Sequence, residues 1–280
     1  MESHFARRMR QEVPLYLLIL VILLVMLFPI AWMLSTSMKT PAEVFAIPAT
    51  WIPNQISWDN YLTAFNATLL RFFANSLIVA LGTMVLSTLA GSMAAYALSR
   101  FPFRGSNALL LFFLATMAFP LPLLMISMYT LFSQLRLLNS YWALILGHTV
   151  ITLPIVVWLL KSFFDSLPRE IEEAAYIDGA SPFHTFVRIV LPISRPGLAA
   201  AAIFGFVTSW NEFIMGLSFT SSTDMRPLPA GISLVFLQEF QYRWAEMMAV
   251  ATLATLPILI IFLLFQRNFI QGLTAGAVKG

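Results

Sequence analysis

Two neighbouring polar side chains, Asn211 and Glu212, lie inside an otherwise apolar stretch of the sequence. An ionisable group within a bilayer costs about 3 kcal/mol at mid-span, so such a residue is first considered a functional candidate. Together with Asn75, which lies near the start of another apolar stretch, these side chains can exchange hydrogen bonds with the hydroxyl groups of a polar solute. The alternative is a structural hydrogen bond between helices or to a partner subunit, and the sequence leaves both open.

Residues for other kinds of chemistry are missing from the sequence. There is no cysteine, which excludes disulfides, thiolate nucleophiles and cysteine-bound metals. His148 has no second histidine or carboxylate at ligand spacing, so we expect it to pack and not to bind a metal. The only lysines, Lys39, Lys161 and Lys279, do not stand in the G-x-x-x-x-G-K-[ST] pattern that holds nucleotide phosphates. We therefore predict no catalytic residue, metal site or cofactor in this chain.

The class of protein that carries these residues follows from the composition. Of the 280 residues, 59% are hydrophobic and only 10% are charged, and the mean hydropathy is +0.83. Soluble domains are about 45–50% apolar and about 25% charged, and disordered chains combine low hydrophobicity with high charge. Both classes are excluded, so we predict an all-α polytopic membrane protein.

Six stretches are long and apolar enough to cross a bilayer as helices, since a crossing needs about 20 residues. They are Val13–Ser35, Ala74–Ser99, Ala108–Ser133, Tyr141–Lys161, Gly197–Ser218 and Ala245–Phe265. By this division, residues 1–12 are an N-terminal tail, 13–35 the first transmembrane helix, 36–73 an external loop and 267–280 a C-terminal tail. Residues 74–266 form a core domain of five helices, which includes a loop at 165–196. Prolines inside the spans, Pro120 and Pro122 among them, are expected to kink the helices.

The basic residues indicate how the six spans are oriented. Cytoplasmic loops of membrane proteins carry an excess of lysine and arginine. Of the 16 such residues, Lys39, Arg71, Arg136, Arg226 and Arg243 fall on one side, and the other 11 fall on the side of the two termini. Both termini and the 165–196 loop are therefore predicted to be cytoplasmic. Because the basic residues are explained as topology signals, we expect no binding to nucleic acid.

The loop at 165–196 has the sequence features of two short helices. Pro168 suits the first turn of a helix, and acidic residues, which are favourable there, follow it. Asp178-Gly179 is a natural end for this helix, because Gly179 can take the left-handed conformation of a C-terminal cap. Ser181-Pro182 is typical of the start of a second helix, which Pro192 is expected to end.

Each of these predicted helices has two faces. The apolar face of the first consists of Ile171, Ala174 and Ala175, by their spacing. Its polar face consists of Glu172, Glu173 and Tyr176. The apolar stripe of the second consists of Phe183, Phe186, Val187 and Val190. Such a pair of helices could dock into a cleft of a cytoplasmic partner or rest on the lipid headgroups, and periodicity does not decide between the two.

The same loop carries a spaced pattern: Glu173-Ala174-Ala175, three residues, Gly179, nine residues, Ile189, one residue, and then Leu191-Pro192. This pattern resembles the EAA loop of permease subunits of binding-protein-dependent ABC importers. Three further segments resemble the sugar-importing branch: Phe73–Ser76, Ser209–Phe213 and Gly272–Gly280. The resemblance covers nearly the whole chain, and the family it resembles most is the smaller permease subunit of maltose-type carbohydrate importers.

The resemblance implies a type I ABC importer permease, with six transmembrane helices and a cytoplasmic coupling helix between helices 4 and 5. The residues that would couple it to a separate ATPase are Glu173, Ala174, Ala175, Asp178, Gly179, Ile189, Leu191 and Pro192. The candidates for the substrate pathway are Asn211, Glu212 and Asn75. Transport would proceed by alternating access between the two sides of the membrane.

The resemblance also implies an assembly in a prokaryotic inner membrane, surrounded by lipid. Two copies of an ATP-binding subunit would bind ATP and Mg²⁺, and a second permease subunit of different sequence would complete the pathway. An extracytoplasmic solute-binding protein would deliver the sugar, which is an oligosaccharide, a disaccharide or a related polyol or sugar phosphate.

An ion-coupled secondary transporter of a small polar solute is the alternative. Such carriers commonly have buried carboxylate or histidine relays and inverted repeats. This sequence has one clear intramembrane acid and no visible repeat. An intramembrane serine protease would need a positioned serine and histidine, and no G-x-S-x-G pattern is present to suggest one.

Overall fold

The computed structural model describes residues 4–101, 103–237 and 243–277, which form helices joined by turns and loops, with no strand in these ranges. Among the described residues, four unbroken helices are long and apolar enough to cross a membrane. Two bent helix pairs raise this number to six if each pair makes one crossing. The predicted all-α membrane architecture is therefore confirmed.

The chain divides into two compact units, Met1–Asn66 with Val235–Thr255, and Ala67–Leu234 with Leu256–Gly280. The first unit contains α1 (His4–Ser37), α2 (Pro41–Val44), α3 (Asp59–Ala64) and the first part of α14 (Trp244–Ala277). The backbone of α1 is helical from His4, so this helix extends into the predicted N-terminal tail. Its most apolar stretch has no buried residue within the chain. A helix that is apolar all round is suited to contact with lipid.

Polar contacts fold the segment that follows α1, within the predicted external loop. Lys39 Nζ donates to the carbonyl oxygen of Thr50 at 2.5 Å and lies 4.3 Å from the centre of the Trp32 ring. Glu43 Oε1 accepts hydrogen bonds from Thr50 Oγ1 at 2.9 Å and from the backbone N–H of Asn54 at 2.8 Å. The Asn54 N–H, which stabilises the charged carboxylate, holds the pKa of Glu43 below its usual value. These contacts close the chain between residues 39 and 54 into a structured loop.

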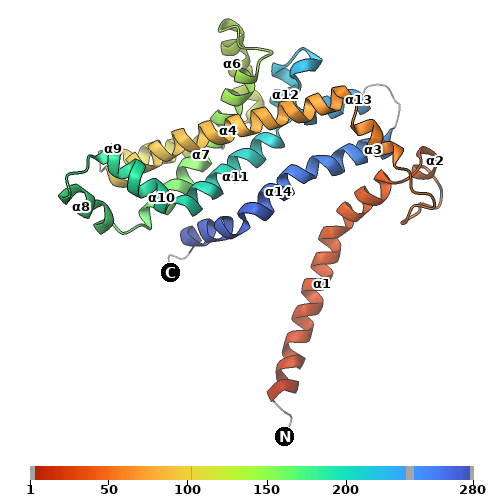
Figure 1. Ribbon diagram of the computed structural model, residues 1–280, viewed down its shortest axis with the longest axis horizontal. Helices are drawn as coiled ribbons and strands as arrows, with labels where there is room; N and C mark the ends of the chain where they lie inside the picture. The colour runs from red at the N-terminus through yellow and green to blue at the C-terminus, as the bar shows by residue number, and fades with distance from the viewer. Residues whose placement is uncertain (1–3, 102, 238–242, 278–280) are drawn as a thin grey trace. The chain divides into compact units, whose positions relative to one another are not determined.

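The second unit is built around three long helices, and short elements connect them. Its elements are α4 (Ala67–Arg100), α5 (Ser106–Thr116), α6 (Leu121–Gln134), α7 (Tyr141–Asp165), α8 (Glu170–Ile177), α9 (Pro182–Thr185), the π-helix η1 (Phe186–Val190), α10 (Leu191–Ile193), α11 (Arg195–Trp210), α12 (Ile214–Phe219), the 3₁₀-helix η2 (Thr223–Met225), most of α13 (Leu228–Phe236) and the remainder of α14. Helices α4, α7 and α11 pack against one another (Figure 1). Their shared core contains Ala95 of α4, Val156 and Leu160 of α7, and Ala201 of α11.

Small residues allow these long helices to approach closely. A Cβ atom placed on Gly91 of α4 would lie 2.5 Å from Val156 Cγ1 of α7. A Cβ atom on Gly197 of α11 would lie 2.5 Å from the ring of Phe163 of α7. Small residues at helix crossings are a general means of packing membrane helices, because apolar lipid provides no hydrophobic drive for helix association.

The third predicted span is broken in the structure. Where the sequence predicts one helix over Ala108–Ser133, the chain forms α5 and α6, which are bent by 96° at a short break. Pro120 is the residue before α6, and Pro122 lies in its first turn. Proline has no backbone N–H, and its ring collides with the preceding helical turn, so α5 cannot continue through this point. The kink expected from these prolines is therefore a complete break.

The fifth predicted span, Gly197–Ser218, is also interrupted. Helix α11 ends at Trp210, and the chain becomes helical again at Ile214. At its other end, α11 is bent by 81° relative to the helical segment Pro182–Ile193. This bend falls at Ser194, so the second helix of the loop runs one residue beyond Pro192, which was predicted to end it.

Candidate functional site

Four residues separate the end of α7 from α8, the first helix of the segment predicted to couple to an ATPase. Helix α8 starts at Glu170, two residues after Pro168, and Arg169 is its N-cap. The backbone N–H groups of Glu172 and Glu173 donate to the carbonyl oxygen of Arg169 at 2.9 and 3.0 Å. The glutamates of this first turn lie where negative charge is favourable to the helix dipole.

Gly179 ends α8 in the conformation that the sequence predicts. Its φ angle is +84°, in the left-handed region. The N–H of Gly179 donates to the carbonyl of Tyr176 at 3.0 Å, and the N–H of Ala180 donates to the carbonyl of Ala175 at 2.9 Å, which together form a Schellman motif. A Cβ atom on Gly179 would meet no atom within 4 Å. The backbone conformation, and not a lack of space, therefore favours glycine at this position.

Ser181 begins the second helix as predicted, because its hydroxyl accepts a hydrogen bond from the N–H of His184 at 3.3 Å. The helix then widens into the π-helix η1, in which the N–H of Leu191 bonds to the carbonyl of Phe186, five residues earlier. Pro192 follows at once. It has no N–H to donate, and the wider turn gives room for its ring.

The predicted apolar stripe of the second helix is divided between two faces. Phe186 and Val190, one turn apart, are buried in the core of the unit. The Phe186 ring lies 4.7 Å from the ring of Tyr96 in α4. Phe183 and Val187 are exposed, with 70% and 39% of their surface accessible. The segment is therefore anchored by one pair of side chains and presents the other pair outward.

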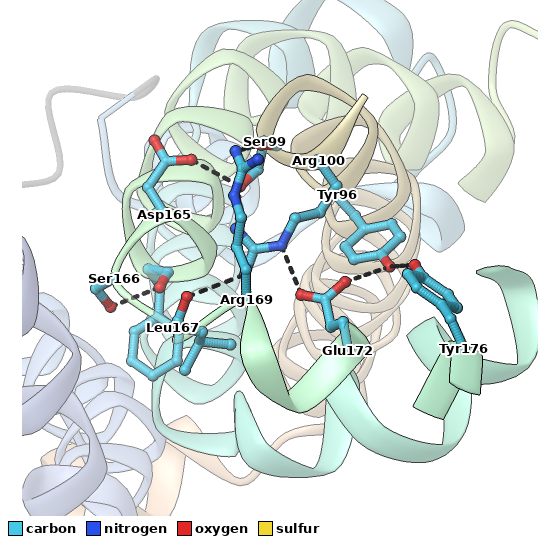
Figure 2. Close-up of polar contacts among 10 residues, drawn as sticks. Tyr96, Ser99, Arg100, Asp165, Ser166, Leu167, Arg169, Glu172 and Tyr176 are labelled. Carbon is cyan, nitrogen blue, oxygen red and sulfur yellow. Dashed lines mark hydrogen bonds and ion pairs between the residues drawn. The ribbon is translucent and has the colours of Figure 1, made fainter. Parts of the chain in front are cut away.

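The position of Glu172 in the structure differs from the predicted faces of α8 (Figure 2). The sequence placed it on the outward polar face, but it is buried. Its Oε1 accepts a hydrogen bond from Arg100 Nε at 2.5 Å, and its Oε2 accepts one from the hydroxyl of Tyr96 at 2.7 Å. Of the predicted apolar face, Ile171 and Ala174 are exposed, whereas Ala175 is buried as predicted. The ion pair with Arg100, which spacing within α8 cannot reveal, decides which face of the helix is turned inward.

Arg100, the last residue of α4, joins three parts of the chain. Besides Glu172, its guanidinium donates to Ser99 Oγ at 3.1 Å and to the carbonyl of Leu167 at 3.3 Å. Ser99 Oγ in turn donates to Asp165 Oδ1, at the end of α7, at 2.6 Å. The end of α4 thus holds the end of α7, the connector that follows it, and α8. Tyr96 and Arg100 lie one turn apart at the end of a span, and this was the signal in the sequence for a buried acid nearby.

A groove of about 730 Å³ lies between α8 and the second helix. Its lining residues are Ile171, Ala174, Ala175, Asp178, Gly179, Ala180, Ser181, His184 and Ile189. Five of the eight predicted coupling residues are among them. Of the other three, Glu173 and Pro192 are exposed, and Leu191 packs against the core. The structure therefore gathers most of the spaced pattern around one concave surface.

Glu212 lies at the break between α11 and α12. Its two carboxylate oxygens accept hydrogen bonds from the backbone N–H groups of Met215 at 2.9 Å and Gly216 at 3.1 Å, at the start of α12. Glu212 Oε2 is also 3.3 Å from His148 Nε2 of α7. The residue is only 8% exposed. Glu212 therefore fixes the start of α12 and lies against α7.

His148 lies inside a small polar cluster that its spacing in the sequence did not reveal. Besides its contact with Glu212, its Nδ1 is 2.7 Å from Ser209 Oγ, and Ser209 Oγ donates to Thr83 Oγ1 at 3.3 Å. The residues come from α4, α7 and the end of α11, which are far apart in the chain. His148 is fully buried, as expected for a packed histidine, but it has a carboxylate neighbour that the sequence analysis did not anticipate.

The other two pathway candidates differ in exposure. Asn75 is buried in α4, where its Nδ2 donates to the carbonyls of Asp224 and Arg226 and its Oδ1 accepts from the Tyr141 hydroxyl. These bonds hold the segment around η2 against α4 and α7. Asn211 is exposed after the end of α11, and its Nδ2 donates to the carbonyl of Val207 at 2.9 Å. In the described part of the chain, no group of three or more histidine or acidic residues is placed to hold a metal ion.

Comparison with protein families gives a match over more than half of the chain. Residues 87–275 match the family described as the binding-protein-dependent transport system inner membrane component. The matched range includes α7, the loop with α8 to α10, and α11.

Similar proteins include permeases of sugar transport systems. The chain is 40% identical over 255 residues to the sulfoquinovosyl glycerol transport system permease protein SmoH of Agrobacterium fabrum, covering 91% of this chain and 89% of that protein. It is 34% identical over 279 residues to the trehalose/maltose transport system permease protein MalG of Thermococcus litoralis, covering 97% and 100%.

The fold also matches a solved structure. A chain of a bacterial ABC transporter involved in the import of the acidic polysaccharide alginate superimposes with a TM-score of 0.80. The match covers 96% of this chain and 99% of that chain at 21% sequence identity. This similarity supports the fold of the chain.

Proposed function

Because this chain belongs to the family of binding-protein-dependent transport system inner membrane components, we propose that it carries a carbohydrate from a solute-binding protein into the cytoplasm. The chain is a permease of an ABC importer, a transport subunit without an ATPase domain of its own. Family membership sets aside the ion-coupled carrier as an alternative.

The main support for the proposed coupling role is the groove between α8 and the second helix. It is concave, and it is lined by Ala174, Asp178 and Gly179 of the spaced pattern. Glu173 is exposed nearby and offers a carboxylate to a partner. An ATPase subunit seated here would displace α8 when two ATPase subunits, binding ATP and Mg²⁺, close on each other. The helices would then switch access from the cytoplasm to the binding protein.

The orientation of the chain is proposed from the basic residues. The chain is a multi-pass inner membrane protein. Both termini and the α8–α10 segment lie in the cytoplasm in this proposal, because 11 of the 16 lysine and arginine residues fall on that side. The external loop and the segment around η2 then face the extracytoplasmic binding protein. A second permease subunit, of different sequence, faces this one across the solute pathway.

The three polar candidates have different roles along that pathway. Asn211 is exposed at a helix break, so its amide contacts the hydroxyl groups of the passing solute. Glu212 and Asn75 are buried and bonded to backbone groups of neighbouring segments. They hold in place the helix ends that form the wall of the pathway. Helix breaks that line a cavity are a common feature of substrate sites in transporters.

The solute class is proposed from the relatives. SmoH belongs to a transport system for sulfoquinovosyl glycerol, and MalG belongs to one for trehalose and maltose. A carbohydrate is therefore the proposed cargo, whether an oligosaccharide, a disaccharide or a related polyol or sugar phosphate.

Affinity purification of the tagged chain in mild detergent, with identification of the co-purifying proteins, tests this assembly. We expect an ATPase, a second permease and a binding protein to be recovered with the chain. A thermal-shift sugar screen on that binding protein then identifies the cargo. Recovery of the chain with no ATPase would contradict the proposal.

A further inference from the structure

We infer that the buried pair of Arg100 and Glu172 is the positioning element that transmits a displacement of α8 to α4. This inference rests on the coupling role proposed above and names the residues that connect the proposed docking segment, α8 to α10, to the transmembrane core. Neither residue belongs to the spaced pattern that lines the groove. Figure 2 shows the pair between the end of α4 and the inward face of α8.

Besides a hydrogen bond of 3.4 Å from Arg169 Nη2 to the Ser99 carbonyl, two connections join α8 to the core on its N-terminal side. The first is covalent and consists of the four residues between Asp165 and Glu170, which form a turn. The second is the contact of Glu172 with Arg100 and Tyr96, at 2.5 and 2.7 Å. The Tyr176 hydroxyl, one turn along α8, lies 3.4 Å from that of Tyr96. A short turn can pivot, whereas a carboxylate held by two donors from one helix fixes both the distance and the direction between α8 and α4.

The burial of the pair makes this connection stiff. The side chains of Arg100 and Glu172 are only 7% and 6% exposed. Water therefore does not compete with their contact, and losing one partner leaves a buried charge without compensation. Arg100 also donates to Ser99 Oγ and to the carbonyl of Leu167, so its guanidinium cannot turn aside. A push on α8 is thus delivered to α4, which packs along α7 and α11 in the core.

A purely structural anchor would affect only how much complex assembles, so the test measures coupling in assembled complexes. Glu172→Gln keeps the shape of the side chain and removes its charge. We expect the amount of solute transported per ATP hydrolysed to fall by about two- to thirtyfold, the range found for mutations that weaken coupling between sites. Arg100→Lys keeps the charge but loses the fork of donors, so its effect should be intermediate. Arg243→Met, which removes an ion pair with Glu246 at the start of α14, is the matched control and should leave the ratio unchanged.

A double variant keeps the test independent of general destabilisation. If the two residues act as a unit, Arg100→Gln combined with Glu172→Gln lowers transport per ATP no further than the worse single variant.

Because the chain contains no cysteine, Ile177→Cys and Met93→Cys place spin labels on exposed positions of α8 and α4. The labelled chain is measured in the assembled complex, with the other subunits free of reactive cysteine. When ATP is added, the distribution of distances between the two labels should stay narrow in the parent and broaden in the Glu172→Gln variant.

The outcomes separate this inference from the proposed function. A wild-type complex that couples ATP hydrolysis to transport, with an unchanged ratio and label distance in Glu172→Gln, would overturn the role of the pair and leave the docking segment intact as a proposal. A wild-type complex whose ATP hydrolysis never responds to the loaded binding protein would overturn both.

Discussion

At the scale of single residues, the backbone conformation of Gly179 sets the turn between α8 and the second helix. Its left-handed φ of +84° turns the chain between α8 and the second helix. The groove lies between these two helices. The side-chain position of Gly179 is open, so any effect of substitution there is conformational.

We predict that Gly179→Val abolishes transport while the subunits still assemble. A β-branched residue resists positive φ, at a cost of about 1–3 kcal/mol, so the turn is expected to open and misalign the groove. Uptake in proteoliposomes, compared at equal amounts of purified complex, measures the effect. Gly179→Asn, which tolerates this conformation better, should retain activity. Gly105→Val imposes similar strain at a φ of +97° outside the segment and should leave transport largely intact. Normal uptake by Gly179→Val would count against the coupling role of this turn.

A second residue-scale prediction concerns Asn211. If its exposed amide contacts the solute, Asn211→Ala should raise the KM of transport by about two- to tenfold, the equivalent of one lost hydrogen bond. The yield of complex should not change, because the side chain is exposed. Gln134→Ala removes another exposed amide, at the end of α6, and serves as the control. A variant with normal KM and reduced yield would show that Asn211 has only a structural role.

Residue-level prediction from the sequence succeeded where the cause is local. The Gly179 cap and the Ser181 cap depend on a few consecutive residues, so residue type and position were sufficient to predict them. The burial of Glu172 and the carboxylate neighbour of His148 were missed because the partners, Arg100 and Glu212, are 72 and 64 positions away. Only the packing of α4 against α7 and α8 brings the first of these pairs together.

At the scale of elements, α4 and α7 pack closely against each other. They belong to the group of helices that the α8–α10 segment is proposed to move. Gly91 provides this approach, since a Cβ atom there would fall 2.5 Å from Val156 Cγ1. Gly91→Ala should destabilise the detergent-solubilised protein by about 1–3 kcal/mol through overpacking, seen as a lower midpoint of thermal unfolding.

A smaller side chain on the facing helix should restore part of the stability that Gly91→Ala loses. Gly91→Ala combined with Val156→Ala should recover part of the lost stability, because the smaller side chain accommodates the added methyl group. Leu89→Val, a change at an exposed position of the same helix, should have little effect. If Gly91→Ala is as stable as the parent, α4 and α7 do not pack as tightly as the structure has them.

Element prediction from the sequence depended on length and hydropathy, which identify apolar stretches but not where a helix stops. The stretches at Ala108–Ser133 and Gly197–Ser218 are long and predominantly apolar, yet both contain breaks. Pro120 and Pro122 gave a signal for the first break. The second has no proline, and there Glu212 bonds to the N–H groups that start α12.

At the scale of the whole molecule, the chain combines a packed helical core with the α8–α10 segment, which is anchored on one face and open on the other. Phe186, Val190 and Glu172 fix the segment inward, and the groove lined by Ala174 and Asp178 opens outward. Such an arrangement suits a subunit that receives motion from a separate motor, because the segment can be pushed without unfolding.

Solute uptake per ATP in proteoliposomes that contain the complete complex tests this account most directly. The parent is compared with Ala174→Trp, which fills the groove from an exposed position and leaves the core untouched. We predict ATP-driven uptake that requires the ATPase subunits and falls to background when the groove is filled, with the permease still folded. Full uptake by Ala174→Trp, or uptake by the permease without any ATPase, would contradict the account.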